Sequence, residues 1–409
     1  MARITLTEGS RQHRALQMGI AAIGALVVLT LPLLTDEVGA IETFTQIACY
    51  AVAILGLGLL TGYTGQISIG MSAFVGLGAY TTIILVVDHG WPYLATIPVG
   101  IVLCLIAGAL VGIPALRIRG LYLVTVTLAV AALFPVLVHR FSDLTGGTDG
   151  KFAQDMEVPT WTPVDPYVRA GVPRLHYYII VLIAALAFLV AWNVVRSRVG
   201  RAMLAVRDSE LSASANGVPV ARVKVFAFAL SAAYGGLAGS LLVIQAPVVS
   251  ETRFDLFLSV FLLVGLIVGG SGTIIGAIPG AIAFVALRTY IADWTEALGL
   301  LGARAESGQI VGVISGLLLL LFVFLLPGGL VDGLGTLRRR FLVVIPRPPA
   351  GWQQYIPASG APAIAHDHPV TERPTGSRPP VPPPADAPLV SARVPGTTAP
   401  LQRTSHEKG

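Results

Sequence analysis

The sequence predicts an all-α fold, a polytopic integral membrane helical bundle of about ten transmembrane spans with one long cytoplasmic loop. Of the 409 residues, 54% are hydrophobic and only 12% are charged, which is about half the charged fraction of a soluble globular domain. Most of the apolar runs are long enough to cross the hydrocarbon core, which takes roughly 17–25 residues as a helix. They lack the alternation of barrel strands, and only helices and closed barrels pair their backbone within lipid.

Ten runs are the candidate spans of a membrane domain at residues 15–335. In chain order they are residues 15–34, 44–60, 67–87, 94–116, 121–138, 177–195, 225–244, 256–268, 274–287 and 310–326. The first run follows three arginines, as the core of a signal peptide would, but it is longer than the roughly 7–15 apolar residues of a cleaved signal. We therefore expect it to remain as a span. Residues 62–87 are rich in glycine and polar residues, so this segment is either a regular span or a broken or re-entrant segment, which needs protein or a cavity around it.

The basic residues orient the chain, because cytoplasmic loops carry an excess of lysine and arginine. The segment at 1–14 holds three arginines, so we expect it in the cytoplasm. Alternation of the spans then places the polar loop at 197–224, which holds five basic residues, in the cytoplasm and the loop at 140–175 outside. Both termini are cytoplasmic in this topology. The basic residues within 140–175 argue against it, but long loops are less bound by the rule.

Other features of the composition exclude several classes of protein. The net charge of +5 gathers at the ends of spans, which does not favour nucleic-acid binding. Cys49 and Cys104 lie inside apolar runs, so we expect no disulfide framework and no metal site. Residues 345–409 are rich in proline and cannot form a core, so we expect a disordered cytoplasmic tail with polyproline II character.

The first motif is a glycine- and serine-rich segment at residues 60–80. Small residues let helices approach closely, and polar groups at membrane depth need partners. Either a polar translocation path or plain small-residue packing explains the pattern. The candidate residues are Gly62, Gly65, Gln66, Ser68, Gly70 and Ser72.

The second motif is the glycine-rich segment at residues 266–280. It resembles a phosphate-binding loop, but no lysine follows its glycines and no strand precedes it, so a nucleotide site is not expected. The glycines instead favour a tight turn between closely packed helices. The candidate residues are Gly269, Gly270, Gly272 and Thr273.

The third motif is a helix within the 197–224 loop. Met203, Val206, Glu210, Ala213 and Gly217 recur at steps of three and four, so they lie near one face of a single helix. Gly217 is followed by valine and proline, which is a typical helix stop. The remaining candidates are Arg207 and Asp208 on the neighbouring stripe and Ala215 beside it. Such a helix either lies on lipid headgroups or contacts a soluble partner.

No catalytic constellation is present in the sequence, and we expect neither enzymatic activity nor a cofactor. Acidic residues are nearly absent from the candidate spans. Ion-coupled carriers usually need ionisable groups at membrane depth. Their scarcity favours a transporter with an external energy source, or a passive channel.

Six motifs in order resemble the permease subunits of branched-chain amino-acid ABC importers, of the LivM type, over roughly residues 40–335. They are residues 60–80, 116–129 (LRIRGLYLVTVTLA), 144–150 (LTGGTDG), 197–224, 266–280 and 325–330 (LLPGGL). The resemblance implies that the 197–224 loop is a coupling loop that docks on an ATPase subunit. Glu210, Ala213 and Gly217 match the family positions, whereas Ser212 stands where these permeases often have alanine.

The resemblance also implies partners, location and substrate. The partners would be a homologous second permease subunit, two ABC ATPase subunits and an extracytoplasmic substrate-binding protein, in the bacterial inner membrane. The small-molecule substrate would be a branched-chain amino acid, moved inward by alternating access. Other amino acids, urea or short amides remain open as substrates, and so does a stand-alone channel or carrier.

Overall fold

The computed structural model describes residues 4–7, 37–115, 121–152, 173–245, 248–286 and 342–345, and four isolated positions between 24 and 32. The chain divides into two units, Met1–Arg347 and Pro348–Gly409, and every described residue lies in the first. The described part is dominated by apolar helices, which confirms the predicted helical membrane bundle. The expected last span and the tail beyond Ile345 lie outside the described residues, as does nearly all of the expected first span.

Most described helices agree with the expected spans in position. The long helices are α2 (Val38–Thr64), α4 (Tyr93–Ala115), α5 (Leu121–Arg140), α7 (Pro173–Arg196) and α10 (Val220–Val243), with α11 (Leu256–Gly269) preceded by the 3-10 turn η2 (Glu251–Phe254). In the described part of the chain, these six segments are long and apolar enough to cross a membrane. Two apolar helices are shorter, α3 (Met71–Val87) and Ala277–Ala286.

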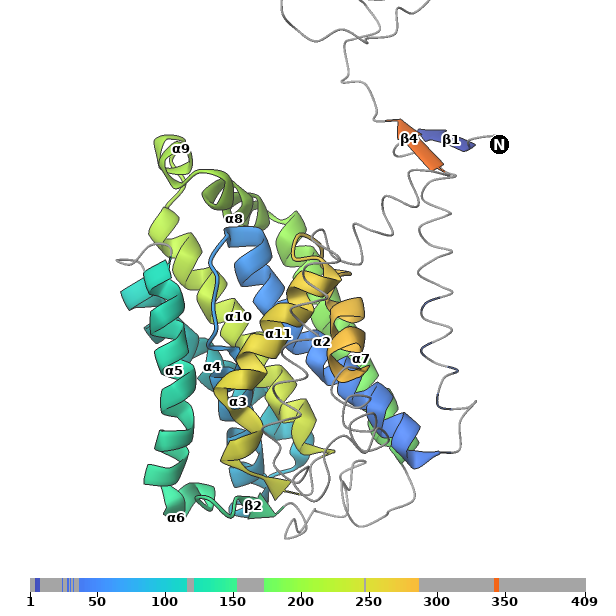
Figure 1. Ribbon diagram of the computed structural model, residues 1–409, viewed down its shortest axis with the longest axis vertical. Coiled ribbons are helices and arrows are strands. Elements are labelled where there is room, and N and C mark those ends of the chain that lie inside the picture. Colours follow the sequence, from blue (N-terminus) through green and yellow to red (C-terminus); the bar gives the residue numbers. More distant parts are fainter. Residues whose placement is uncertain are drawn as a thin grey trace, which may run out of the picture. The chain divides into compact units, whose positions relative to one another are not determined.

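Helix α10 lies among α2, α3 and α4 and packs against all three (Figure 1). Small residues permit the close approach: a Cβ on Gly239 would lie 1.8 Å from the Val75 carbonyl oxygen of α3. A Cβ on Gly78 of α3 would lie 2.2 Å from the Gly236 carbonyl oxygen of α10. Because lipid supplies no hydrophobic drive between helices, such backbone contacts carry much of the packing. This glycine stripe of α10 was not among the sequence motifs.

The expected segment at 62–87 is broken between α2 and α3. Helix α2 ends at Gly65, whose φ of 71° is left-handed, and α3 begins only at Met71. The residues between them are not helical, although Gln66 and Ser68 are buried. Figure 1 shows this segment as an extended loop beside the helices, starting at the end of α2 near α8. The expected span at 67–87 is therefore a short helix with an irregular entry.

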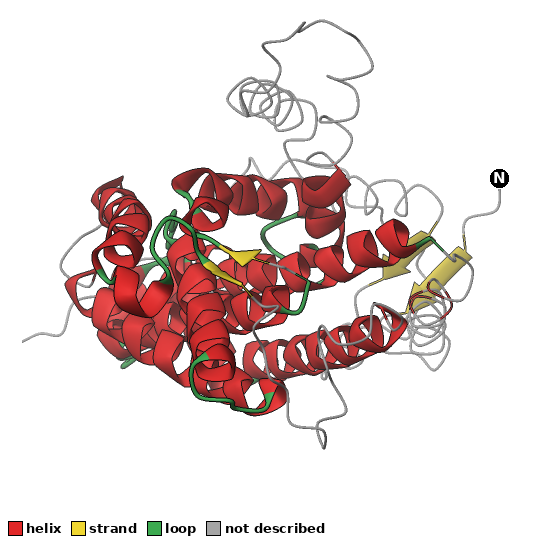
Figure 2. Cartoon of the chain, turned by 90° about the horizontal axis from the view of Figure 1, so that it is seen from below, coloured by secondary structure: helices red, strands yellow, loops and turns green. Residues whose placement is uncertain are grey.

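The two ends of the bundle carry different structures. The short helices α8 (Arg198–Asp208) and α9 (Glu210–Ala215) lie at one end, and α6 (Ser142–Thr145) and β2 (Lys151–Phe152) lie at the other (Figure 1). Strand β2 pairs antiparallel with β3 (Val248–Val249). Seen from that end, this small ribbon lies across the helices (Figure 2). Strand β1 (Ile4–Thr7) pairs in parallel with β4 (Leu342–Ile345).

Candidate functional site

The loop expected to hold one helix holds two, separated by Ser209. Ser209 is extended (φ −163°, ψ 114°), so α8 ends there and α9 starts there. Its side chain accepts a hydrogen bond from the Ser212 N–H at 3.2 Å, because serine oxygens satisfy the free N–H groups of a helix start. The last residues of the 197–224 loop also belong to α10, which begins at Val220. The single-helix prediction was wrong because a capping residue interrupted a continuing apolar pattern.

One face of α8 and α9 is buried against the bundle. Met203, Val206 and Ala213 pack in an apolar cluster with residues of α2, α3, α5 and α10. Leu211, on the other side of α9, is 82% exposed. Ser212 and Ala215 are exposed as well. Ala213 thus holds α9 on this chain, and the outward surface of α9 is formed by its neighbours.

Two polar contacts tie the short helices to the bundle. The Arg207 guanidinium donates a hydrogen bond to the Gly62 carbonyl oxygen near the end of α2, at 2.8 Å. Glu210 forms an ion pair with Lys224, a buried residue in the second turn of α10. Asp208 is exposed and lies 3.4 Å from the Arg207 side chain. The α8–α9 pair is therefore held to α2 and α10 separately.

The turn after α11 completes this junction. A Cβ on Gly62 would lie 1.7 Å from the Ser271 carbonyl oxygen, so only glycine allows α2 and the turn to touch. Thr273 stabilises the turn by donating to the Gly270 carbonyl oxygen at 3.4 Å and accepting from the Gly276 N–H at 3.2 Å. The structure thus brings the first and third motifs together through Arg207, and the first and second through Gly62. Two other candidates differ in their surroundings: Gly269 packs against the Gly276 backbone, whereas Gly272 faces open space.

The irregular entry to α3 is stabilised by side chains from other helices. Ser259 of α11 accepts a hydrogen bond from the Ser72 N–H at 2.8 Å and donates to the Ser72 hydroxyl at 2.7 Å. Thr127 of α5 accepts from the Ile69 N–H at 3.0 Å. A helix start leaves N–H groups without partners, and here α5 and α11 supply them.

The remaining candidates in this segment have local partners. Gln66 donates to the Thr64 hydroxyl at 3.1 Å, and Ser68 accepts from the Gly70 N–H at 3.3 Å. Gly70 also lies against Thr127, whose carbonyl oxygen would be 3.0 Å from an added Cβ. The polar groups of the first motif are therefore satisfied within the irregular entry. Sequence reasoning found these residues, and it included Thr127 only as part of the 116–129 motif, without a partner. It missed Ser259, because a single polar residue in an apolar run forms no motif.

Aromatic side chains meet further along α3. The ring centroids of Tyr80, Phe134 and Phe254 lie 6.0–6.4 Å apart, and the three residues come from α3, α5 and η2. Phe134 packs on Gly76, where an added Cβ would lie 2.3 Å from the ring. Ser72, Gly76 and Tyr80 share one face of α3 at steps of four. The cluster was not expected from the sequence because its members lie more than fifty residues apart along the chain.

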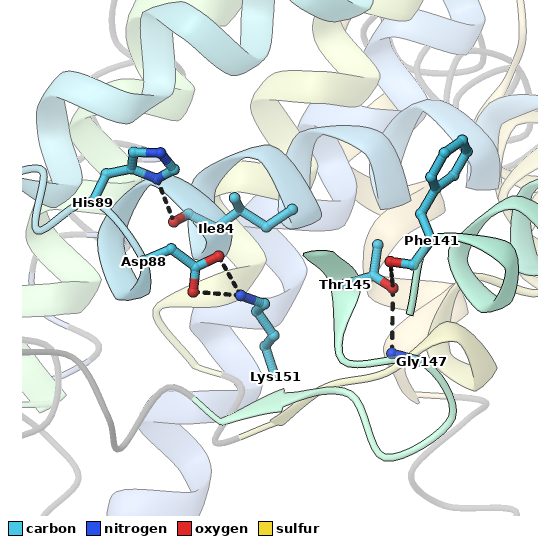
Figure 3. Close-up of polar contacts among 7 residues, drawn as sticks. All are labelled: Ile84, Asp88, His89, Phe141, Thr145, Gly147 and Lys151. Carbon is cyan, nitrogen blue, oxygen red and sulfur yellow. Dashed lines mark hydrogen bonds and ion pairs between the residues drawn. The ribbon is translucent and has the colours of Figure 1, made fainter. Parts of the chain in front are cut away.

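The end of α3 opposite the α8–α9 pair is closed by the LTGGTDG motif and β2. Lys151 forms an ion pair with Asp88, which follows α3, and His89 contacts the Ile84 carbonyl oxygen (Figure 3). Thr145 donates to the Val138 carbonyl oxygen at 2.6 Å and accepts from the Gly147 N–H at 3.2 Å. This motif therefore builds a compact turn at the end of the bundle.

Comparison with known proteins identifies the family of this chain. A family model described as branched-chain amino acid transport system / permease component matches residues 39–323. The chain belongs to this family. It is a permease subunit of an ABC importer and a multi-pass membrane protein, and it is a transport subunit without enzymatic activity of its own. Permease components of this class imply ATPase and binding-protein partners.

Three relatives illustrate the range of the family. The high-affinity branched-chain amino acid transport system permease protein LivM of Escherichia coli K12 is 29% identical over 66% of this chain and 68% of the relative. The probable branched-chain amino acid transport permease protein LivM of Methanocaldococcus jannaschii is 24% identical over 56% of this chain and 65% of the relative. The autoinducer 2 import system permease protein LsrC of Enterobacter sp. strain 638 is 27% identical over 74% of this chain and 88% of the relative. No solved structure matches the chain.

Proposed function

We propose that this permease imports branched-chain amino acids and that α9 is the helix on which an ATPase subunit acts. The single observation that carries the coupling role is the two-sided geometry of α9. Its inner side is anchored to α10 by Ala213 and by the Glu210–Lys224 ion pair, while Leu211 on its outer side is 82% exposed. An exposed leucine on an anchored helix suits a docking surface for a soluble motor. The relatives named LivM support the substrate class.

The proposed assembly holds a second, homologous permease, two ATPase subunits and an extracytoplasmic binding protein. In the proposed orientation α8 and α9 face the cytoplasm in the bacterial inner membrane, and both termini lie on that side. Closure of the ATPases pulls α9, and with it α10 and the end of α2 that Arg207 holds. Substrate then moves along the face of α3 that carries Ser72 and Tyr80.

The orientation is tested by impermeant thiol labelling of intact cells, on a background without the two native cysteines. Ser214→Cys on α9 and Asp149→Cys at the opposite end both replace exposed residues. We expect labelling at position 149 only, with labelling at 214 after lysis. Labelling at 214 in intact cells would reverse the orientation.

The transport role is tested by reconstituting the importer with its binding protein in proteoliposomes. We expect ATP-dependent uptake of leucine, isoleucine and valine. Uptake without ATP would favour a stand-alone carrier or channel. Competition by urea, short amides or other amino acids would show a different substrate class, which is relevant because the LsrC relative is named for autoinducer 2 import.

A further inference from the structure

The outer part of the proposed path contains two buried polar atoms that lack partners. The hydroxyl oxygen of Tyr80 and Oε2 of Glu251 are both buried, and neither has a hydrogen-bond partner among the described residues. The Tyr80 side chain is only 4% exposed. Glu251 begins the short helix η2, which ends at Phe254, and the Phe254 ring centroid lies 6.3 Å from that of Tyr80. Buried polar groups without partners are rare because they lose hydration without compensation, so this pair indicates a place that receives a ligand.

The surroundings restrict the ligand to a cation with hydrogen-bond donors. The carboxylate of Glu251 is an acceptor only, and it belongs to none of the ion pairs found in the described part of the chain. Tyr80 also contributes its ring, which meets Phe134 and Phe254. Aromatic rings beside a carboxylate attract an ammonium group and repel an anion.

We propose that Glu251 and Tyr80, with the rings of Phe134 and Phe254, bind the primary ammonium group of the transported amino acid. This inference rests on the proposed function, because it requires a substrate that carries such a group. An ammonium group offers three donors, which the carboxylate and the tyrosine hydroxyl accept.

The position of the site within the fold fits a step on the way inward. Glu251 and Phe254 belong to η2, which directly follows the β3 strand at the outer end. Phe134 packs on Gly76, one helical turn from Tyr80 in the direction of the Ser72–Ser259 pair. The Phe134 ring therefore separates the ammonium site from the polar entry of α3, and substrate passes when this ring moves.

The site is tested on the purified permease–ATPase complex in lipid nanodiscs, without the binding protein, so that only the permease selects. Thermal unfolding midpoints are compared with 3-methylbutylammonium, 4-methylpentanoate and 3-methylbutanol, which share a branched apolar group. We expect only the amine to raise the midpoint. Glu251→Gln should increase the amine concentration for half-maximal effect at least about ten-fold, as expected for loss of a charge-assisted hydrogen bond.

Two further variants separate the site from general stability. Tyr80→Phe keeps the ring and removes the hydroxyl, so it should weaken the amine effect less than Glu251→Gln does. Glu37→Gln removes an exposed carboxylate that precedes α2 and should leave the effect unchanged. If Glu251→Gln does not fold, Glu251→Asp keeps the charge and should bind the amine more weakly than the wild type.

An equal effect of the acid or the alcohol would overturn the ammonium assignment, and so would an undiminished amine effect in Glu251→Gln. Uptake by the complete importer separates the two proposals. An importer that takes up leucine but does not respond to the amine refutes this site alone. A complex that binds the amine but imports no branched-chain amino acid refutes the proposed function.

Discussion

Removing one partner of the Glu210–Lys224 ion pair should uncouple ATP hydrolysis from uptake. The Lys224 side chain is 9% exposed and that of Glu210 is 34% exposed. Breaking a fully buried pair costs about 3–5 kcal/mol, and an exposed pair contributes about 0.2–1 kcal/mol. Because Glu210 is one-third exposed, we expect Glu210→Gln to cost about 1–2 kcal/mol. Lys224→Met should cost less, because the remaining carboxylate can turn toward water.

The assay is the ratio of leucine uptake to ATP hydrolysis in proteoliposomes. A cost of 1–2 kcal/mol corresponds to a factor of roughly 5–30 in the population in which α9 is held against α10. Glu210→Gln should therefore lower the ratio of uptake to hydrolysis by several-fold while basal ATP hydrolysis persists. The double variant Glu210→Gln/Lys224→Met removes both charges and should recover part of the loss, as in a double-mutant cycle. Strictly additive losses, or an unchanged ratio in Glu210→Gln, would refute the mechanical role of this pair.

Three further predictions follow from the same junctions. Leu211→Asp should weaken co-purification of the ATPase without lowering the thermal midpoint of the permease, because Leu211 contacts solvent here; Leu211→Met is the control, and intact co-purification with the aspartate contradicts docking. Gly217, at φ 78°, has open space around it, so Gly217→Asn should retain uptake and Gly217→Val should not, since a β-branched residue resists this conformation. Equal uptake by the two variants would show that the left-handed backbone at Gly217 is not needed for transport. Ser259→Ala leaves the Ser72 N–H unpaired and should destabilise the permease by about 1–3 kcal/mol in thermal unfolding; a midpoint no lower than that of the control Ser212→Ala, at an exposed position, would contradict the capping role.

The helical class and most helix positions were predictable from the sequence, because the backbone can form only helices or closed barrels in lipid. The length of each apolar run then predicts a helix that crosses the membrane. Residues 94–116 were expected as a span, and α4 covers Tyr93–Ala115. A break within residues 62–87 was one of the open alternatives, because glycine and serine suit both packing and irregular backbone. Local pattern could not decide, since the break depends on Thr127 and Ser259, which lie far away in the sequence.

The candidate site, too, was only partly predictable from the sequence. The residues of the proposed coupling loop were identifiable, yet their surroundings depend on tertiary contacts: Ala213 is buried in the apolar cluster, and Leu211 is exposed. The partner of Glu210 is Lys224, a residue that the charge pattern had used only for topology. Periodicity identifies a helical face, but it does not say which neighbour covers that face.

In the proposed mechanism, α10 carries force from α9 to α3. Lys224 joins its first turns to α9, and Ser240 near its other end accepts a hydrogen bond from Thr82 of α3 at 2.8 Å. Between these points, Gly236 and Gly239 rest directly on the α3 backbone, so α10 cannot shift without moving α3. Close-packed interfaces transmit displacement because they have discrete arrangements and little compressibility. Since Tyr80 lies on α3 between the Gly78 and Thr82 contacts, the proposed pull on α9 would act on the aromatic cluster through a continuous chain of packed residues.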